Sequence, residues 1–189
     1  SLRMAQKIEG KSKLKFPKNY EDLVEKYSKE CEIDPTIIYS LIRSESFFDP
    51  DVSSMAGAIG LTQLMDFTAN DIARKLKISE YSLTNPETNI QFGTYYLKNM
   101  ISRLENDYLN GFFAYNAGIT RVRRWLNTSI LGFGKKSNMP SDLFLETLPY
   151  TETREYGRKL VSASVMYKTL YSENPEQDFE EIIKLLIEF

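Results

Sequence analysis

The sequence contains no histidine and a single cysteine, Cys31. The absence of histidine excludes Ser-His-Asp catalysis, Cys-His catalysis and most zinc sites. One cysteine cannot form an internal disulfide, and its place on the apolar face of a predicted helix favours a small buried hydrophobic residue over a nucleophile. Any acid–base chemistry in this chain must therefore come from Glu, Asp, Lys or Tyr side chains.

The sequence also lacks a strong net charge and a long apolar run. Its 24 Lys and Arg residues against 26 Asp and Glu residues give a formal net charge of −2. No global basic field therefore indicates a nucleic-acid partner. No apolar run reaches the roughly 18 residues that span a membrane, and no signal segment is visible. Residues 1–18 are locally basic, which we interpret as a solvated tail, with an electrostatic hold on an anionic wall or membrane as the alternative.

Helix signals, by contrast, are frequent and are separated by short connections. N-caps are predicted at Asn19, Asp34, Asn85, Asp107 and Thr151, each followed by apolar residues at helical spacing. Further helices are expected near 67–77, 120–129, 142–147 and after Asn174, together with a short helical piece at Leu61–Met65 and a surface loop at 131–141. The pattern predicts an all-α, compact multi-helix domain.

One carboxyl falls on a helical stripe that should be apolar. Glu45 follows Ile38, Leu41 and Ile42 by seven, four and three residues, so the four side chains share one face of a helix. A carboxyl buried on that face must either find partners or take up a proton as its pKa rises. A raised pKa is what a general acid needs near neutral pH.

A plainer interpretation is that Glu45 lies exposed at the helix end or pairs with Arg43 or a Lys. The segment that follows, residues 51–60, favours the functional interpretation. It is rich in small residues and carries Gly57 and Gly60 three positions apart, so its backbone can approach a ligand closely.

Four motifs follow one another between about residues 20 and 170. The first comprises Glu45-Ser46, Ser54, Gly57-Ala58-Ile59-Gly60-Leu61-Thr62-Gln63-Leu64-Met65 and Thr68-Ala69; the second Asn89-Ile90, Gly93 and Tyr96-Leu97; the third Ala114-Tyr115-Asn116-Ala117-Gly118; the fourth Glu146-Thr147-Leu148-Pro149-Tyr150-Thr151-Glu152-Thr153-Arg154-Glu155-Tyr156. In this order they resemble the signature of soluble lytic transglycosylases. Thr62 and Asp66 stand where that family usually has Met and Pro.

The resemblance implies a fold and a reaction. The implied fold class is all-α, a lysozyme-like multi-helix single domain of the goose type. In similar enzymes one Glu, here Glu45, is the sole general acid/base. It protonates the oxygen of the β-1,4 bond between N-acetylmuramic acid and N-acetylglucosamine, then acts as base on the muramyl C6 hydroxyl, which leaves 1,6-anhydromuramyl ends. Ordinary glycosidases need two carboxylates, but a substrate that supplies its own nucleophile needs only one. We interpret the neighbouring Asp49 and Asp51 as structural.

The resemblance also implies substrate-binding residues. They are Ser54, at the position that hydrogen-bonds the catalytic carboxyl, and the groove residues Gln63, Met65, Thr68, Tyr115, Asn116 and Glu146. Plainer roles are a turn bond for Ser54, core filling for Met65 and a solvated helix position for Glu146. A basic cluster at residues 121–124 is interpreted as a solvated helix face, with contact to peptide-stem carboxylates as the alternative.

The chain is expected to have three parts: a basic N-terminal tail (1–18), a lytic transglycosylase catalytic domain (19–172) and a C-terminal amphipathic helix (173–189). The expected partner is the peptidoglycan glycan strand, with no nucleic acid, no visible membrane association and a monomer as the default. No metal or other cofactor is implied. The substrate implies an extracytoplasmic location, in the periplasm or cell wall. The alternatives are a goose-type lysozyme-like hydrolase on the same fold and a non-catalytic peptidoglycan-binding domain.

Overall fold

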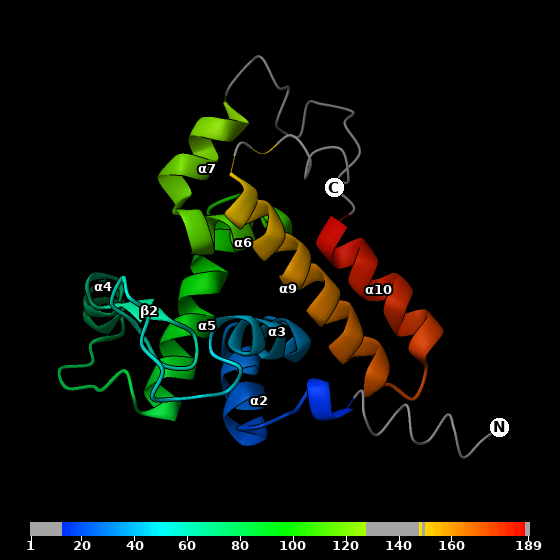
Figure 1. The fold of residues 1–189 in the computed structure, drawn as a ribbon, viewed down its shortest axis with the longest axis horizontal. Coiled ribbons are helices and arrows are strands. Elements are labelled where there is room, and N and C mark those ends of the chain that lie inside the picture. Colours follow the sequence, from blue (N-terminus) through cyan, green and yellow to red (C-terminus); the bar gives the residue numbers. More distant parts are fainter. Residues whose placement is uncertain (1–12, 128–147, 149, 188–189) are drawn as a thin grey trace.

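The fold is a layered packing of helices with one very small sheet (Figure 1). A computed structural model of the chain describes residues 13–127, 148 and 150–187. Its elements are α2 (Glu21–Glu30), α3 (Pro35–Glu45), β1 (Ala58–Ile59), β2 (Leu64–Met65), α4 (Asp66–Leu76), α5 (Pro86–Ser102), α6 (Tyr108–Ala117), α7 (Ile119–Leu126), α9 (Thr151–Leu170) and α10 (Pro175–Ile187). The prediction of an all-α, multi-helix domain is confirmed. None of the helices in the described ranges is long and apolar enough to span a membrane.

Three of the predicted N-caps are confirmed by their hydrogen bonds. The side chain of Asp34 accepts from the backbone N–H of Thr36 at 2.9 Å, and Asn85 and Asp107 cap α5 and α6 in the same way. Each side chain satisfies a backbone donor that the first turn leaves without a helical partner. Gly118 ends α6 at a φ of 86°, which suits a residue without a Cβ.

Two other predicted caps were wrong. The residue before α2 is Tyr20, in the left-handed region at a φ of 60°, rather than Asn19. Thr151 is the first residue inside α9, and Tyr150 precedes it without a side-chain cap. In both cases the chain enters the helix one position away from the polar residue that local propensity favours.

The short helix predicted at Leu61–Met65 was also wrong. Residues 61–63 form a turn, and Leu64 pairs with Ile59 in the antiparallel ladder of β1 and β2. Gln63 has a positive φ of 49°, which breaks a right-handed helix. The predicted loop at 131–141 and helix at 142–147 lie outside the described residues.

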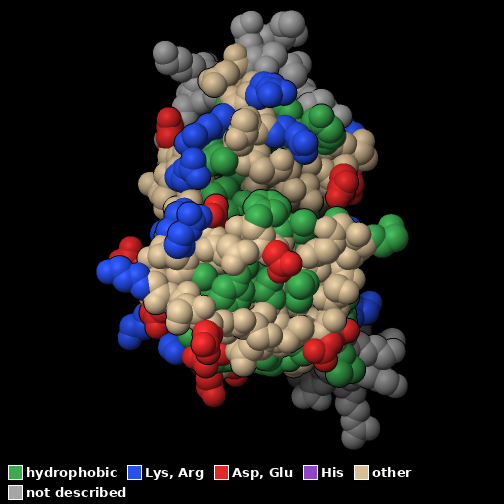
Figure 2. Space-filling view, turned by 90° about the vertical axis from the view of Figure 1, so that its left-hand side faces the viewer, with side chains coloured by type: hydrophobic (Ala, Val, Ile, Leu, Met, Phe, Trp, Pro, Cys, Tyr) green, Lys and Arg blue, Asp and Glu red, His purple; other side chains and the backbone are tan. Residues whose placement is uncertain are grey.

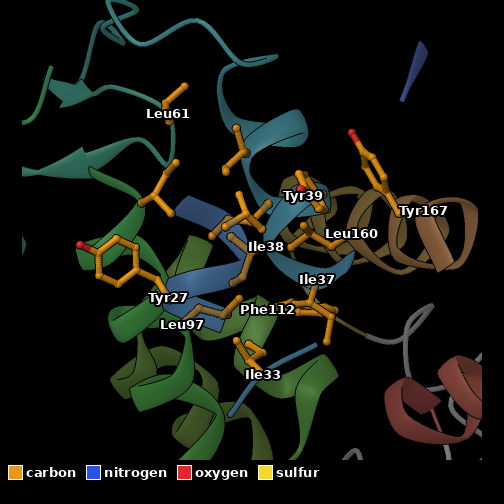
Figure 3. Packing of buried hydrophobic residues seen from close by; sticks show 14 of the residues in the cluster. Tyr27, Ile33, Ile37, Ile38, Tyr39, Leu61, Leu97, Phe112, Leu160 and Tyr167 are labelled. Carbon is orange, nitrogen blue, oxygen red and sulfur yellow. The ribbon is translucent and has the colours of Figure 1, made fainter. Parts of the chain in front are cut away.

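The centre of the core is α3, whose residues 37–42 are all buried. It packs most extensively against α9. Figure 3 shows Ile37 and Ile38 of α3 among Leu160 of α9, Phe112 of α6 and other core side chains. A helix enclosed on several sides is apolar nearly all round. A polar group at the end of α3 is therefore held by a rigid element.

The segment 13–18, assigned to the tail from sequence, contacts the helical core. Arg43 of α3 donates its Nε–H to the carbonyl oxygen of Lys15 at 2.8 Å. The hydroxyl of Tyr167 on α9 donates to the carbonyl oxygen of Pro17 at 2.9 Å. This segment is therefore tied to the two helices that form the centre of the fold.

The C-terminal helix α10 closes the core against α6 and α9. Its residues Ile182 and Leu186 are buried, whereas Phe179 is exposed. We expect Ile182→Ala to lower the free energy of unfolding by about 2–5 kcal/mol, because it leaves a cavity where α10 meets the core. Chemical denaturation would measure this, with Phe179→Ala as the exposed control. Equal, small effects for both substitutions would contradict the packing of α10.

Candidate active site

Glu45 is the last residue of the buried helix α3. Its carboxylate accepts a hydrogen bond from the hydroxyl of Tyr156 on α9, with 2.5 Å between Tyr156 Oη and Glu45 Oε1. The alternative pairing with Arg43 is not seen, because the guanidinium of Arg43 lies over the ring of Phe16, 4.3 Å from its centroid. Within the described residues, Tyr156 is the hydrogen-bond partner of Glu45. The carboxyl therefore sits among uncharged groups.

This environment changes the acidity of the carboxyl. Loss of water around the side chain raises the pKa of Glu45 from 4.5 to about 7, and the hydrogen bond from Tyr156 lowers that pKa without cancelling the effect. Burial disfavours the charged form, whereas a donor to the carboxylate favours it. Glu45 can therefore hold a proton near neutral pH and also release it, as a group that acts first as acid and then as base requires.

Tyr156 was missed as a site residue by sequence reasoning. A signal was present, because Tyr156 follows the buried Thr153 by three positions and precedes the buried Leu160 by four, which places it toward the core on a helix. A Cβ added at Gly157 would collide with the ring of Phe113. The missing side chain thus lets α9 lie close to α6, which brings Tyr156 to Glu45.

Tyr115 and the turn at residues 60–63 form a second layer of the site. The hydroxyl of Tyr115 donates to the carbonyl oxygen of Thr62 at 2.8 Å. The buried Thr62 hydroxyl of this turn donates to Asn89 Oδ1 of α5 at 2.7 Å. The Tyr115 hydroxyl is buried, and both burial and the nearby charge of Glu45 raise its pKa well above the usual value. Tyr115 therefore acts as a neutral donor that fixes the turn beside Glu45.

Gln63 and Ser54 hold the loop rather than the carboxyl. Gln63 donates its side-chain amide to the carbonyl oxygens of Val52 at 3.1 Å and Gly60 at 2.9 Å. The Ser54 hydroxyl oxygen accepts from the backbone N–H of Ala58 at 3.0 Å. The expected hydrogen bond from Ser54 to Glu45 is not formed in the described structure, so the plainer turn role of Ser54 is the one observed.

The other residues predicted to bind substrate lie in two separate parts of the fold. Met65 ends β2 half-buried, and Thr68 is buried in the first turn of α4. On the other side, the exposed Asn116 at the end of α6 accepts a hydrogen bond from the Thr153 hydroxyl of α9 at 2.9 Å. Glu146 lies outside the described residues.

The face that carries α4 and the β pair is chemically mixed. Figure 2 shows hydrophobic side chains gathered in the middle of this face, with Lys and Arg side chains above them. The exposed apolar side chains Met55 and Phe67 come from the loop and the first turn of α4. This face therefore combines an apolar surface with polar edges.

The comparison with known families decides the assignment. Residues 22–132, more than half of the chain, match the transglycosylase SLT domain family. This chain belongs to that family. The SLT domain is 34% identical over 165 residues to a soluble lytic murein transglycosylase of Escherichia coli, a match that covers 85% of this chain and 25% of the relative. It is 31% identical over 170 residues to a membrane-bound lytic murein transglycosylase C of Sodalis glossinidius, covering 79% of this chain and 46% of the relative.

Solved structures agree with this SLT assignment. The 70-kDa soluble lytic transglycosylase of Escherichia coli matches with a TM-score of 0.76 and 33% identity, over 87% of this chain and 27% of that chain. An inactive glutamate-to-glutamine mutant of the lytic transglycosylase Slt from Pseudomonas aeruginosa matches with a TM-score of 0.75 and 30% identity, over 88% and 26% of the two chains. The chain thus spans about a quarter of the length of its soluble relatives.

The Tyr156 hydroxyl gives this SLT domain a testable pH signature. Tyr156→Phe removes the donor that favours the charged carboxylate, so the pKa of Glu45 should rise further above its ordinary value. We expect the alkaline limb of kcat/KM to move to higher pH, with about ten- to hundredfold lower activity from loss of positioning.

The control is Tyr115→Phe, which removes the bond to Thr62 and leaves the Glu45–Tyr156 bond in place. The alkaline limb of its kcat/KM profile should stay at the same pH as in the wild type. An unmoved limb in Tyr156→Phe would show that this hydrogen bond does not set the acidity of Glu45.

Proposed function

We propose that this SLT domain is a peptidoglycan lytic transglycosylase with Glu45 as its sole general acid/base. The observation that carries the proposal is that the desolvated carboxyl of Glu45 has a pKa of about 7 and is held by an uncharged donor. Protonated Glu45 gives its proton to the glycosidic oxygen as the bond from that oxygen to the muramyl C1 breaks. The muramyl C6 hydroxyl oxygen then bonds to C1, and its proton returns to the Glu45 carboxylate. Both protons are accounted for and no water is consumed.

Among the described residues, no second acidic side chain influences the pKa of Glu45, which supports this reaction. Asp49 and Asp51 are the nearest carboxylates along the chain after Glu45, and both are exposed. Asp49 Oδ1 accepts from the backbone N–H of Asp51 at 3.0 Å, a bond that stabilises a turn. A hydrolase that activates water directly needs a second group in position. Intramolecular attack by a substrate hydroxyl has no such requirement.

The proposed substrate groove runs past Glu45 between the loop side and the α6–α9 side. We retain as substrate-binding residues Ser54, Gln63, Met65, Thr68, Tyr115, Asn116 and Glu146. Support comes from the fixed loop that carries Gln63 and from the exposed amide of Asn116. For Ser54 we propose a direct contact with substrate. Its hydroxyl is exposed and bonds the loop rather than the Glu45 carboxyl.

The relatives support the proposal for the chain as a whole. Their names describe enzymes that act on murein, and one related structure is a complex with bulgecin A. We propose peptidoglycan strands as the partner and an extracytoplasmic workplace. We further propose a catalytic domain at 19–172 with a C-terminal helix at 173–189. The contacts of residues 13–18 with α3 and α9 favour adding that segment to the domain.

Product analysis tests the proposed reaction. Purified peptidoglycan would be digested with the wild-type chain and its fragments weighed by mass spectrometry. We expect 1,6-anhydromuramyl ends, lighter than hydrolytic reducing ends by one water, about 18 Da. Reducing ends instead would identify a lysozyme-like hydrolase. No cleavage would favour a non-catalytic binding domain.

A further inference from the structure

An exposed aromatic–arginine pair lies at the start of α9, away from Glu45. The ring of Tyr150 is about half exposed and packs on Trp125 of α7, with 5.4 Å between ring centroids. The guanidinium of Arg121, also on α7, lies over the ring of Tyr150, with its Cζ 5.2 Å from the ring centroid. Tyr150 is thus held by two side chains of α7, while part of its ring and the Arg121 head face solvent.

This pair lies on a line of contacts that begins at the catalytic carboxyl. Along α9, Tyr156 bonds Glu45, Thr153 bonds Asn116 of α6, and Tyr150 contacts α7. These three positions are three residues apart, so at the rise of a helix they cover roughly 9 Å. Figure 1 shows the start of α9 beside α6 and α7. The Arg121–Tyr150 pair is therefore within reach of a group attached to a sugar bound at Glu45.

The charge on the α7 side of the pair has one sign, whereas the first turn of α9 carries Glu152. Helix α7 contains Arg121, Arg123 and Arg124 and no acidic residue. Within the described ranges, no carboxylate forms an ion pair with Arg121. Arg123 differs, because it donates to the carbonyl oxygen of Arg103 at 3.2 Å. A guanidinium held over an aromatic ring loses less freedom when it receives a carboxylate with two parallel hydrogen bonds.

We propose that Arg121 and Tyr150 form a subsite for a carboxylate of the peptide stem of peptidoglycan. Arg121 pairs with the carboxylate, and the exposed face of Tyr150 packs against the apolar part of the stem. This inference rests on the proposed function, since it takes peptidoglycan as the substrate. The proposed subsite would bind a charged group of the peptide stem, whereas the other proposed groove residues contact the glycan.

Binding of a small muropeptide tests the subsite without turnover. The probes are an N-acetylglucosaminyl-N-acetylmuramyl disaccharide with a tetrapeptide stem, and the same compound with its peptide carboxylates amidated. Neither probe contains the bond that the enzyme is proposed to cleave, so calorimetry reads affinity alone. We expect the wild type to bind the carboxylate form about three- to tenfold more tightly. Arg121→Gln should remove that difference and leave affinity for the amidated form unchanged, and Arg121→Lys should keep part of it.

Arg123→Gln is the matched control on the same helix and should preserve the difference. The proposal is overturned if the wild type binds both probes equally, or if Arg121→Gln still distinguishes them. It is also overturned if Arg121→Gln weakens both forms alike, which would indicate a general structural role. A chain that binds the carboxylate form selectively yet cleaves no peptidoglycan would support the subsite and refute the proposed enzyme activity, so the two failures are distinguishable.

Discussion

Glu45→Gln should abolish cleavage of peptidoglycan, lowering turnover by at least about two to four orders of magnitude. Glutamine keeps the shape of the side chain and can still accept the hydrogen bond that Tyr156 donates to Glu45, so the site should remain assembled. It can neither give a proton to the glycosidic oxygen nor take one from the C6 hydroxyl. The measurement is the rate of release of soluble muropeptides at pH 6, with equal amounts of folded protein.

Asp49→Asn is the matched control for this loss. It removes the next carboxylate along the chain, which is exposed and accepts a turn bond from Asp51. We expect activity within a few-fold of wild type. A large loss for Asp49→Asn, or residual activity in Glu45→Gln close to wild type, would show that the reaction depends on a different carboxylate.

Glu45→Gln should also stabilise the fold at alkaline pH. The folded-state pKa of Glu45 is raised from 4.5 to about 7, so the folded state binds the proton more tightly than the unfolded chain. Its contribution to stability is fully present below pH 4.5 and is lost progressively up to about pH 7. At about 1.4 kcal/mol per pH unit, this loss is at most about 3–4 kcal/mol. Glu45→Gln is not ionised and should avoid it.

Urea unfolding of both proteins at pH 4.5 and pH 8 measures this effect. The difference in unfolding free energy between Glu45→Gln and wild type should grow in favour of the mutant from the lower to the higher pH. All other titrating groups are shared by the two proteins, so they cancel in the comparison. A difference that stays constant between the two pH values would mean that Glu45 ionises as easily in the folded state as in the unfolded one.

Such an exchange of stability for activity is physically coherent. The carboxyl is held at the end of α3, the helix enclosed by the core, and burial is the larger influence on its pKa. A group made useful by desolvation is necessarily destabilising once it is charged. Replacing it should therefore remove both properties together.

Local sequence signals predicted much of the scaffold. Asp34 and Asn85 each precede a proline that opens a helix, and each caps its helix as expected. These signals are strong because a cap and a proline act within one turn. The apolar stripe that ends in Glu45 was also readable, since it depends only on helical periodicity.

Features that depend on contacts across the fold were less readable. The bond from Tyr156 to Glu45 joins residues 111 positions apart, and no periodicity reports such a pairing. The turn at residues 61–63 was wrongly predicted as part of a helix at Leu61–Met65, because its geometry depends on Asn89, whose side chain accepts the Thr62 N–H at 2.8 Å. Tertiary hydrogen bonds there override a local preference for helix.

Ser54 illustrates the limit of transferring a role by resemblance. Its position in the motif implied a bond to the catalytic carboxyl, yet its hydroxyl accepts from Ala58 within its own loop. A serine in a turn commonly bonds nearby backbone. Sequence placed the residue in the right loop but could not decide which partner its hydroxyl selects.

Because the proposed chemistry requires Glu45 to hold a proton near neutral pH, a direct titration of that carboxyl is the sharpest test. Carboxyl carbon chemical shifts of a ¹³C-labelled chain would be followed by NMR from pH 3 to pH 9, and the signal absent in Glu45→Gln would be assigned to Glu45. We predict a midpoint at about pH 7. A midpoint near the ordinary value of 4.5 would mean that Glu45 is ionised at neutral pH and would contradict its role as the acid.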